Sequence, residues 1–232
     1  MLTKPLRLTR RLKNRPVARL MLLLPVALAW PVQAAASCPA AGGGQVAQLL
    51  CQQPELQQLD QQLNQVYQQA LAKATAAAAQ LTQQATDIQA QPVRYLKAEQ
   101  RGWLKGRDEC WKATELSACV RQQYQYRIAQ LQANYQLVAA SGPVLYRCSD
   151  APGSEVMVRF YPTNPASLIA ERGDQVSFML LQGAEDAAKE SAERYLGRNE
   201  SLSHQGTMLR LVWGYQAPEL SCQVTATQPG AQ

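Results

Sequence analysis

Six cysteines are the residues of this 232-residue chain whose number and spacing point most directly to chemistry. They are Cys38, Cys51, Cys110, Cys119, Cys148 and Cys222. No two of them form a CxxC pair, and His204 is the single histidine, so a zinc site of cysteine and histidine ligands is not expected. An even number of cysteines in an exported chain is typical of disulfides. We therefore predict that all six are oxidised, with no metal site and no cofactor.

Catalysis would need residues that this chain lacks in a suitable arrangement. A Ser-His-Asp site would have to use His204 as its base, and no acid in the sequence is placed to orient that histidine. A glycosidase would need two converging carboxyl groups, and the candidates Glu99 and Asp108 are predicted to lie at the surface. The sequence therefore predicts a protein that is not an enzyme.

The first 36 residues have the pattern of a secretory signal peptide. Seven bases and no acid precede Trp30, the run from Leu20 to Trp30 is apolar, and the small residues Ala34, Ala35 and Ala36 follow. Eleven apolar residues are too few for a stable membrane anchor, which needs about 20. We predict cleavage near residue 36 and export to the periplasm. The alternative, less favoured, is an outer-membrane lipoprotein lipidated on Cys38, which would leave an odd number of cysteines and would be the route to a membrane.

Removing this segment changes the charge of the protein. The chain has 23 Lys and Arg against 17 Asp and Glu, and seven of the bases lie in residues 1–36, so the remainder has a net charge of 16 − 17 = −1. Nucleic-acid binding needs a basic surface on the mature protein, and this balance does not supply one. Nucleic acid is therefore not an expected partner.

The residue pattern divides the remainder into two halves. Residues 37–140 repeat apolar side chains at steps of three and four, as in Leu56, Leu59, Leu63 and Val66, which predicts antiparallel amphipathic helices. Residues 141–226 instead favour strands, and residues 227–232 are expected to form a disordered tail. The boundary is expected at Ser141-Gly142-Pro143, because Gly and Pro punctuate elements. The predicted class is α+β, a helical domain followed by a small antiparallel barrel or sandwich.

Five segments of the second half are strand candidates, of which the first, 155–161, alternates Val156, Val158 and Phe160 with outward residues. The others are 168–170, 176–181, 208–213 and 220–224. Cys148 precedes the first candidate and Cys222 lies in the last, so a disulfide between them would close the strand half. Among the first four cysteines three pairings are possible. We favour the pairs nearest in sequence, Cys38 with Cys51 and Cys110 with Cys119.

The helical half resembles the LprI-type N-terminal domain family. The residues that carry the resemblance are Gln100-Arg101, Trp103, Arg107-Asp108 and Cys110, which match a QR-x-W-x3-RD-x-C signature. The match extends over residues 38–135 and includes Cys51, the Leu59-Asp60 and Tyr67 series, and Cys119 followed by Tyr126-Arg127. The resemblance implies an exported helical domain, in some members linked to lysozyme inhibition. Arg101, Trp103, Arg107 and Asp108 could form a binding patch, but a structural role is favoured, with Trp103 in the core and the Arg107-Asp108 pair bracing the Cys110 turn.

The strand half resembles the membrane-bound inhibitors of c-type lysozyme. The resemblance is carried by Tyr146-Arg147-Cys148, the 156–161 segment, Ser191-Ala192-Glu193-Arg194-Tyr195, Gly206 and Cys222. It implies an eight-stranded antiparallel barrel whose loops enter the lysozyme cleft, where a serine and a lysine meet the catalytic carboxylates. Ser191 stands at the serine position, with Ala192 where that family has a glycine. His204-Gln205 precede Gly206 where that family has its lysine.

The predicted contact residues are therefore Ser191, Glu193, His204 and Gln205. Ser191 would donate its hydroxyl, His204 would supply a cation at mildly acidic pH, and Gln205 would be a neutral donor at any pH. The acidic residues around Glu193 would steer a basic lysozyme, whereas Arg194 and Tyr195 would brace the barrel. The sequence thus favours a periplasmic inhibitor of c-type lysozyme. The alternative is a non-catalytic envelope adaptor that keeps the fold without inhibition, favoured by Ala192 and the missing lysine.

Overall fold

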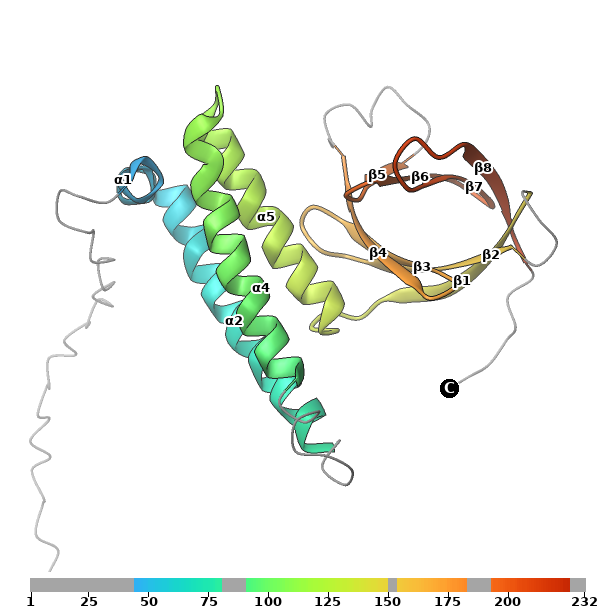
Figure 1. The fold of residues 1–232 in the computed structure, drawn as a ribbon, viewed down its shortest axis with the longest axis horizontal. Helices are drawn as coiled ribbons and strands as arrows, with labels where there is room; N and C mark the ends of the chain where they lie inside the picture. The colour runs from blue at the N-terminus through green and yellow to red at the C-terminus, as the bar shows by residue number, and fades with distance from the viewer. Residues whose placement is uncertain (1–43, 81–90, 150–153, 183–192, 226–232) are drawn as a thin grey trace, which may run out of the picture. The chain divides into compact units, whose positions relative to one another are not determined.

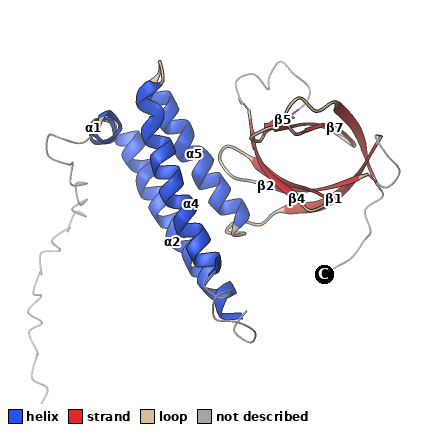
Figure 2. Cartoon of the chain, viewed as in Figure 1, coloured by secondary structure: helices blue, strands red, loops and turns tan. Residues whose placement is uncertain are grey.

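The computed structural model describes residues 44–80, 91–149, 154–182 and 193–225, with helices first and strands after them (Figures 1 and 2). The helices are α1 (Gln45–Gln52), α2 (Pro54–Gln80), α4 (Gln91–Asp108), the 3₁₀ helix η1 (Glu109–Lys112) and α5 (Leu116–Asn134). The strands are β1 (Ser141–Cys148), β2 (Glu155–Tyr161), β3 (Ser167–Arg172), β4 (Gln175–Leu181), β5 (Glu193–Leu196), β6 (Glu200–Gln205), β7 (Met208–Trp213) and β8 (Glu219–Val224). This order confirms the predicted α+β class.

Three long helices form the helical part, and α2, α4 and α5 each contact the other two (Figure 1). The predicted apolar stripe of α2 is buried at Leu56, Leu63 and Ala70, because these side chains recur on one face of the helix. Leu96 of α4 and Val120 of α5 close the same core. Helix α2 begins at Pro54, a residue that suits a first helical turn. Among the helices that the structure describes, none combines the length and apolar character of a membrane span.

Disulfides tie the helices to the turns between them. Cys110 of η1 is bonded to Cys119 of α5, as the spacing predicts. Cys51 at the end of α1 is also disulfide-bonded. Its predicted partner Cys38 lies outside the described residues, so that pairing stays a prediction.

The eight strands form a closed antiparallel barrel in which each strand pairs with the next and β8 pairs with β1. Alternate residues fill the interior: Val156 and Val158 of β2, Leu202 of β6, and Leu209 and Leu211 of β7 are all fully buried. Cys148 and Cys222 are directly opposite each other in the β1–β8 pair and form a disulfide. This predicted bond therefore lies at the seam where the barrel closes.

Three strands were not among the predicted segments: β1, β5 and β6. Ser141-Gly142-Pro143, where the sequence predicts the boundary between the two halves, forms the beginning of β1, and the register of β1 with β2 shifts between Ser141 and Val144. Gly142 has φ +104°, and a Cβ atom there would lie 2.9 Å from the carbonyl oxygen of Val158. Only glycine suits this irregular start of the strand.

Candidate functional site

One end of the barrel gathers most of the predicted contact residues. Because neighbouring strands are antiparallel, this end of the barrel contains the end of β2, the start of β3, the end of β4, the start of β5 and the β6–β7 turn. Glu193 at the start of β5 is paired in register with His204 near the end of β6, and Gln205 follows. Ser191 lies outside the described residues. Glu193, His204 and Gln205 are thus brought together, and their role in a contact stays a prediction.

These three residues differ in how accessible they are. Glu193 and Gln205 are exposed, whereas His204 is half-buried. The His204 ring packs against Phe160 of β2, with 5.2 Å between ring centroids, and lies 6.4 Å from the ring of Tyr146 in β1. Neither β1 nor β2 neighbours β6 in the barrel order, so these contacts cross the barrel interior. His204 is therefore part of the interior at this end, rather than a loop side chain.

The two residues next to Glu193 have separate positions in the barrel. Tyr195 is buried, and its ring packs edge-on against Phe160. Its hydroxyl donates a hydrogen bond to Glu193 Oε2 at 3.1 Å. Burial, together with this neighbouring carboxylate, raises the pKa of Tyr195 above the ordinary tyrosine value. Arg194, which points to the other face of the strand, is exposed.

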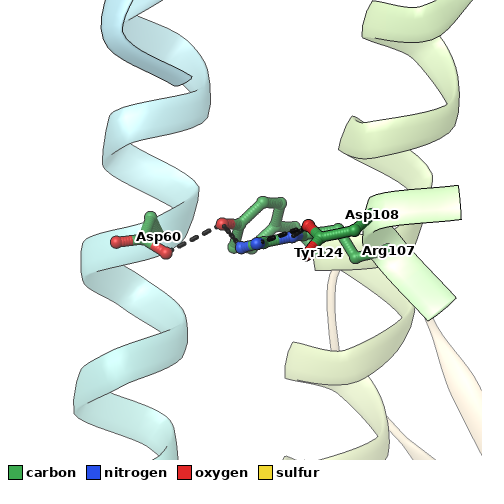
Figure 3. A network of polar contacts seen from close by, with 4 residues as sticks. All are labelled: Asp60, Arg107, Asp108 and Tyr124. Atoms are coloured by element: carbon green, nitrogen blue, oxygen red, sulfur yellow. Dashed lines mark hydrogen bonds and ion pairs between the residues drawn. The ribbon is translucent and has the colours of Figure 1, made fainter. Parts of the chain in front are cut away.

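The signature residues of the helical half meet in a polar network between helices (Figure 3). The hydroxyl of Tyr124 in α5 donates to Asp60 Oδ1 of α2 at 2.8 Å. Arg107 Nη1 of α4 donates to the same hydroxyl oxygen at 2.8 Å, and Arg107 Nε and Nη2 both bond Asp108 Oδ1. One tyrosine hydroxyl therefore links all three long helices.

Trp103 supports this network from α4. Its indole nitrogen donates to the carbonyl oxygen of Gln123 at 3.1 Å, and its ring meets Tyr124 edge-on at 5.2 Å. The Arg107 guanidinium lies over both rings, 5.4 Å from Trp103 and 5.7 Å from Tyr124. These contacts brace the junction of α4, α5 and η1. Arg101, by contrast, is exposed and lies away from the network.

A second polar group is buried between α4 and α5. The side chain of Arg127 is 2% exposed and forms an ion pair with Glu99 across 3.6 Å. Its Nε and Nη1 donate to the amide oxygens of Gln100 and Gln130, and Nη2 has no hydrogen-bond partner among the described residues. Burial lowers the pKa of Arg127, an effect that Glu99 opposes. The sequence signals for this group were the Tyr126-Arg127 and Gln100 matches to the LprI-type family, and neither revealed that Arg127 meets Gln100 and Glu99.

No group of three or more metal-ligating side chains comes together within the described ranges. The arrangement instead supplies rigid scaffolding in the helices and an open set of polar side chains at one barrel end.

Replacing Tyr124 with phenylalanine is expected to lower stability and to change its dependence on pH. Burial raises the pKa of Tyr124 above the ordinary value of about 10. The unfolded chain therefore loses this proton first, so the contribution of the neutral phenol is complete below about pH 10 and declines as the pH rises further. The variant should lose about 1–2 kcal/mol at pH 7, because Asp60 and Arg107 lose a hydrogen bond.

Urea unfolding at neutral and alkaline pH tests both parts of this expectation. The loss of stability between pH 9 and pH 11 should be shallower in the Tyr124 variant than in the parent protein. Tyr215→Phe is the matched control, since Tyr215 is 77% exposed. Equal behaviour of the two variants would argue against a buried hydrogen-bonded phenol.

Comparison with protein families matches residues 36–131 to the family described as Lysozyme inhibitor LprI. Curated relatives include lipoprotein LprI of Mycobacterium bovis and lipoprotein LprI of Mycobacterium tuberculosis. Each is 34% identical over 166 residues, covering 69% of this chain and 71% of the relative. No solved structure matches the chain significantly.

The similarity to these relatives extends beyond the helices. Residues 36–131 are 96 positions, whereas 69% of the chain is about 160 residues. Even an alignment that began at residue 1 would end near residue 160, within β2 of the barrel. The similarity therefore includes at least the beginning of the barrel as well as the signature network around Tyr124. On these grounds, the chain belongs to the LprI family of lysozyme inhibitors.

Proposed function

We propose that this protein is an exported, non-catalytic inhibitor of c-type lysozyme that acts in the periplasm. The observation that carries the proposal is the match of residues 36–131 to the family described as Lysozyme inhibitor LprI. The alignment with the mycobacterial relatives, which reaches into the barrel, supports a role that both halves share.

The proposed contact is the barrel end that carries Glu193, His204 and Gln205. Residues 183–192, which include Ser191, connect β4 and β5 and so join strands whose ends lie at this same barrel end. A lysozyme cleft holds one protonated and one ionised carboxyl group. The serine hydroxyl and the exposed Gln205 amide are neutral donors suited to such groups, and Glu193 adds negative charge toward a basic partner. The closed barrel supports this set on rigid strands, which reduces the entropy lost on binding.

Export is the second component of the proposal. The basic stretch, the Leu20–Trp30 apolar run and the small residues before Ser37 support cleavage near residue 36. The mycobacterial relatives are named lipoproteins. A lipid on Cys38 is the competing arrangement here, and the mass of the mature protein distinguishes the two, because diacylglycerol would add to the mass of the polypeptide.

Inhibition is tested by the lysis of Gram-positive cells by a c-type lysozyme, with and without the mature protein. The parent protein should slow lysis at micromolar concentration. Replacing Ser191, His204 and Gln205 together with alanine should weaken inhibition by tenfold or more, because central contact residues each contribute over about 1 kcal/mol. Gln205→Ala alone should weaken it without loss of fold, since Gln205 is exposed.

The matched control is Asn199→Ala, an exposed residue in the β5–β6 turn at the opposite end of the barrel. It should leave inhibition unchanged. If the triple variant inhibits as well as the parent, the contact does not use this barrel end. If the parent itself does not slow lysis, the envelope adaptor replaces the inhibitor as the better description.

A further inference from the structure

The exposed face of α4 carries a straight row of four bases. Arg94, Lys97, Arg101 and Lys105 are spaced by three, four and four residues, so they lie on one side of the helix over about 16 Å. All four are exposed. The opposite side of α4 contributes the buried Leu96 to the helical core. We call these four residues the α4 basic row.

The α4 basic row has no acidic partner among the described residues. Ion pairs there use other bases, for example Arg121 with Glu55 and Arg127 with Glu99. The two acids of α4 are paired with bases outside the row, Glu99 with the buried Arg127 and Asp108 with Arg107. Since the chain beyond residue 36 has a net charge of −1, four positive charges are concentrated here on an otherwise balanced protein.

Two large side chains flank the row. Tyr95 is 64% exposed and Leu104 is 38% exposed, and by helical spacing they lie on either side of the bases. Arg94, Tyr95, Lys97 and Arg101 also line one open depression of the surface. Bases whose apolar stems lie beside an exposed tyrosine and leucine are typical of side chains at a membrane interface.

We infer that the α4 basic row is a docking surface for an anionic phospholipid bilayer. Charge complementarity identifies the partner: four unpaired cations in a line match the phosphates of a negatively charged leaflet, and each base near such a surface contributes to binding. Tyr95 and Leu104 insert between headgroups on the two sides of the row. A basic lysozyme would be repelled by this face, so the row serves a purpose separate from inhibition. The bilayer contact orients the protein, whether or not a lipid is attached to Cys38.

The test is co-sedimentation of residues 37–232, the chain beyond the predicted signal peptide, with lipid vesicles. Phosphatidylcholine vesicles are compared with vesicles in which a third of the lipid is phosphatidylglycerol. The parent protein should bind the anionic vesicles alone, and added salt should weaken that binding. Replacing all four bases of the row with glutamine should reduce binding by roughly fivefold for each base, and more than a hundredfold in total.

The control removes the same charge elsewhere, with glutamine at the exposed Lys73, Lys112, Arg198 and Arg210. This variant should keep at least a tenth of the parent binding. Equal loss in both variants would show a response to net charge and overturn the inference, as would failure of the parent to bind anionic vesicles. Unchanged binding by the α4 variant would also overturn it. Lysozyme inhibition by both variants should match the parent, which separates this result from the proposed function.

Discussion

Replacing Glu99 with glutamine is expected to lower the free energy of unfolding of the helical part by about 3 kcal/mol. Glu99 is the one acid paired with Arg127 among the described residues, and that guanidinium is 2% exposed. The substitution leaves a buried charge with neutral amide partners at Nε and Nη1 and with none at Nη2. Urea unfolding followed by helical circular dichroism measures the loss.

A second substitution separates a buried charge from a general loss of packing. Adding Arg127→Met to Glu99→Gln should restore most of the stability, because an apolar side chain of similar length removes the unpaired charge. The matched control is Glu55→Gln, which breaks the exposed ion pair between α2 and Arg121 of α5. That pair should contribute less than about 1 kcal/mol. Equal costs for the two glutamate variants would contradict the argument.

Removing the Cys148–Cys222 disulfide is expected to have the largest effect on the barrel. The bond joins residues 74 positions apart, and in the chain-entropy description a loop of that size contributes about 4.4 kcal/mol. It also lies on the β1–β8 pair, in which three residue pairs are in register, so its loss weakens the seam that closes the barrel. Cys148→Ala with Cys222→Ala should therefore destabilise the barrel strongly. Unfolding monitored by Trp213, the tryptophan of β7, measures this effect.

The Cys110–Cys119 disulfide provides the comparison. It joins residues 9 positions apart, so its removal by alanine substitution should cost about 2.6 kcal/mol, roughly 2 kcal/mol less than removal of the barrel bond. A barrel variant with the stability of the parent would show that hydrogen bonding and packing alone keep the seam closed. A greater loss of stability on removing Cys110–Cys119 would show that loop length does not determine which disulfide stabilises the protein more.

Local periodicity explains which elements were predictable. The apolar stripes of α2, α4 and α5 repeat about every 3.6 residues, and the apolar side chains of β2 repeat every 2 residues. Both repeats can be recognised within a short window of the sequence. Strand β6 was missed because its one fully buried apolar residue is Leu202, so Glu200–Gln205 shows no apolar alternation. Strand β5 has four residues, too few for a recognisable pattern.

The candidate sites depended more on distant contacts. Tyr124 was predictable as a member of an apolar stripe, but its hydroxyl bonds Asp60, 64 residues earlier in the chain. His204 was predicted as a contact residue beside a turn, and the barrel places its ring against Phe160 across the interior. Glu193 was predicted for the same contact, and its pairing with His204 follows from the β5–β6 register.

The sequence by itself therefore determined the division into helices and strands and two disulfides, because each rests on composition, spacing or local period. The tertiary structure decided which polar groups meet, as in the Asp60–Tyr124–Arg107 network and in the ion pair between the buried Arg127 and the half-buried Glu99. It also decided that the ring of His204 lies in the barrel interior. It also left the α4 basic row exposed, with the two acids of α4, Glu99 and Asp108, paired with Arg127 and Arg107. The physical reason is that helix packing and barrel closure bring together residues far apart in the chain, and no local repeat encodes that alignment.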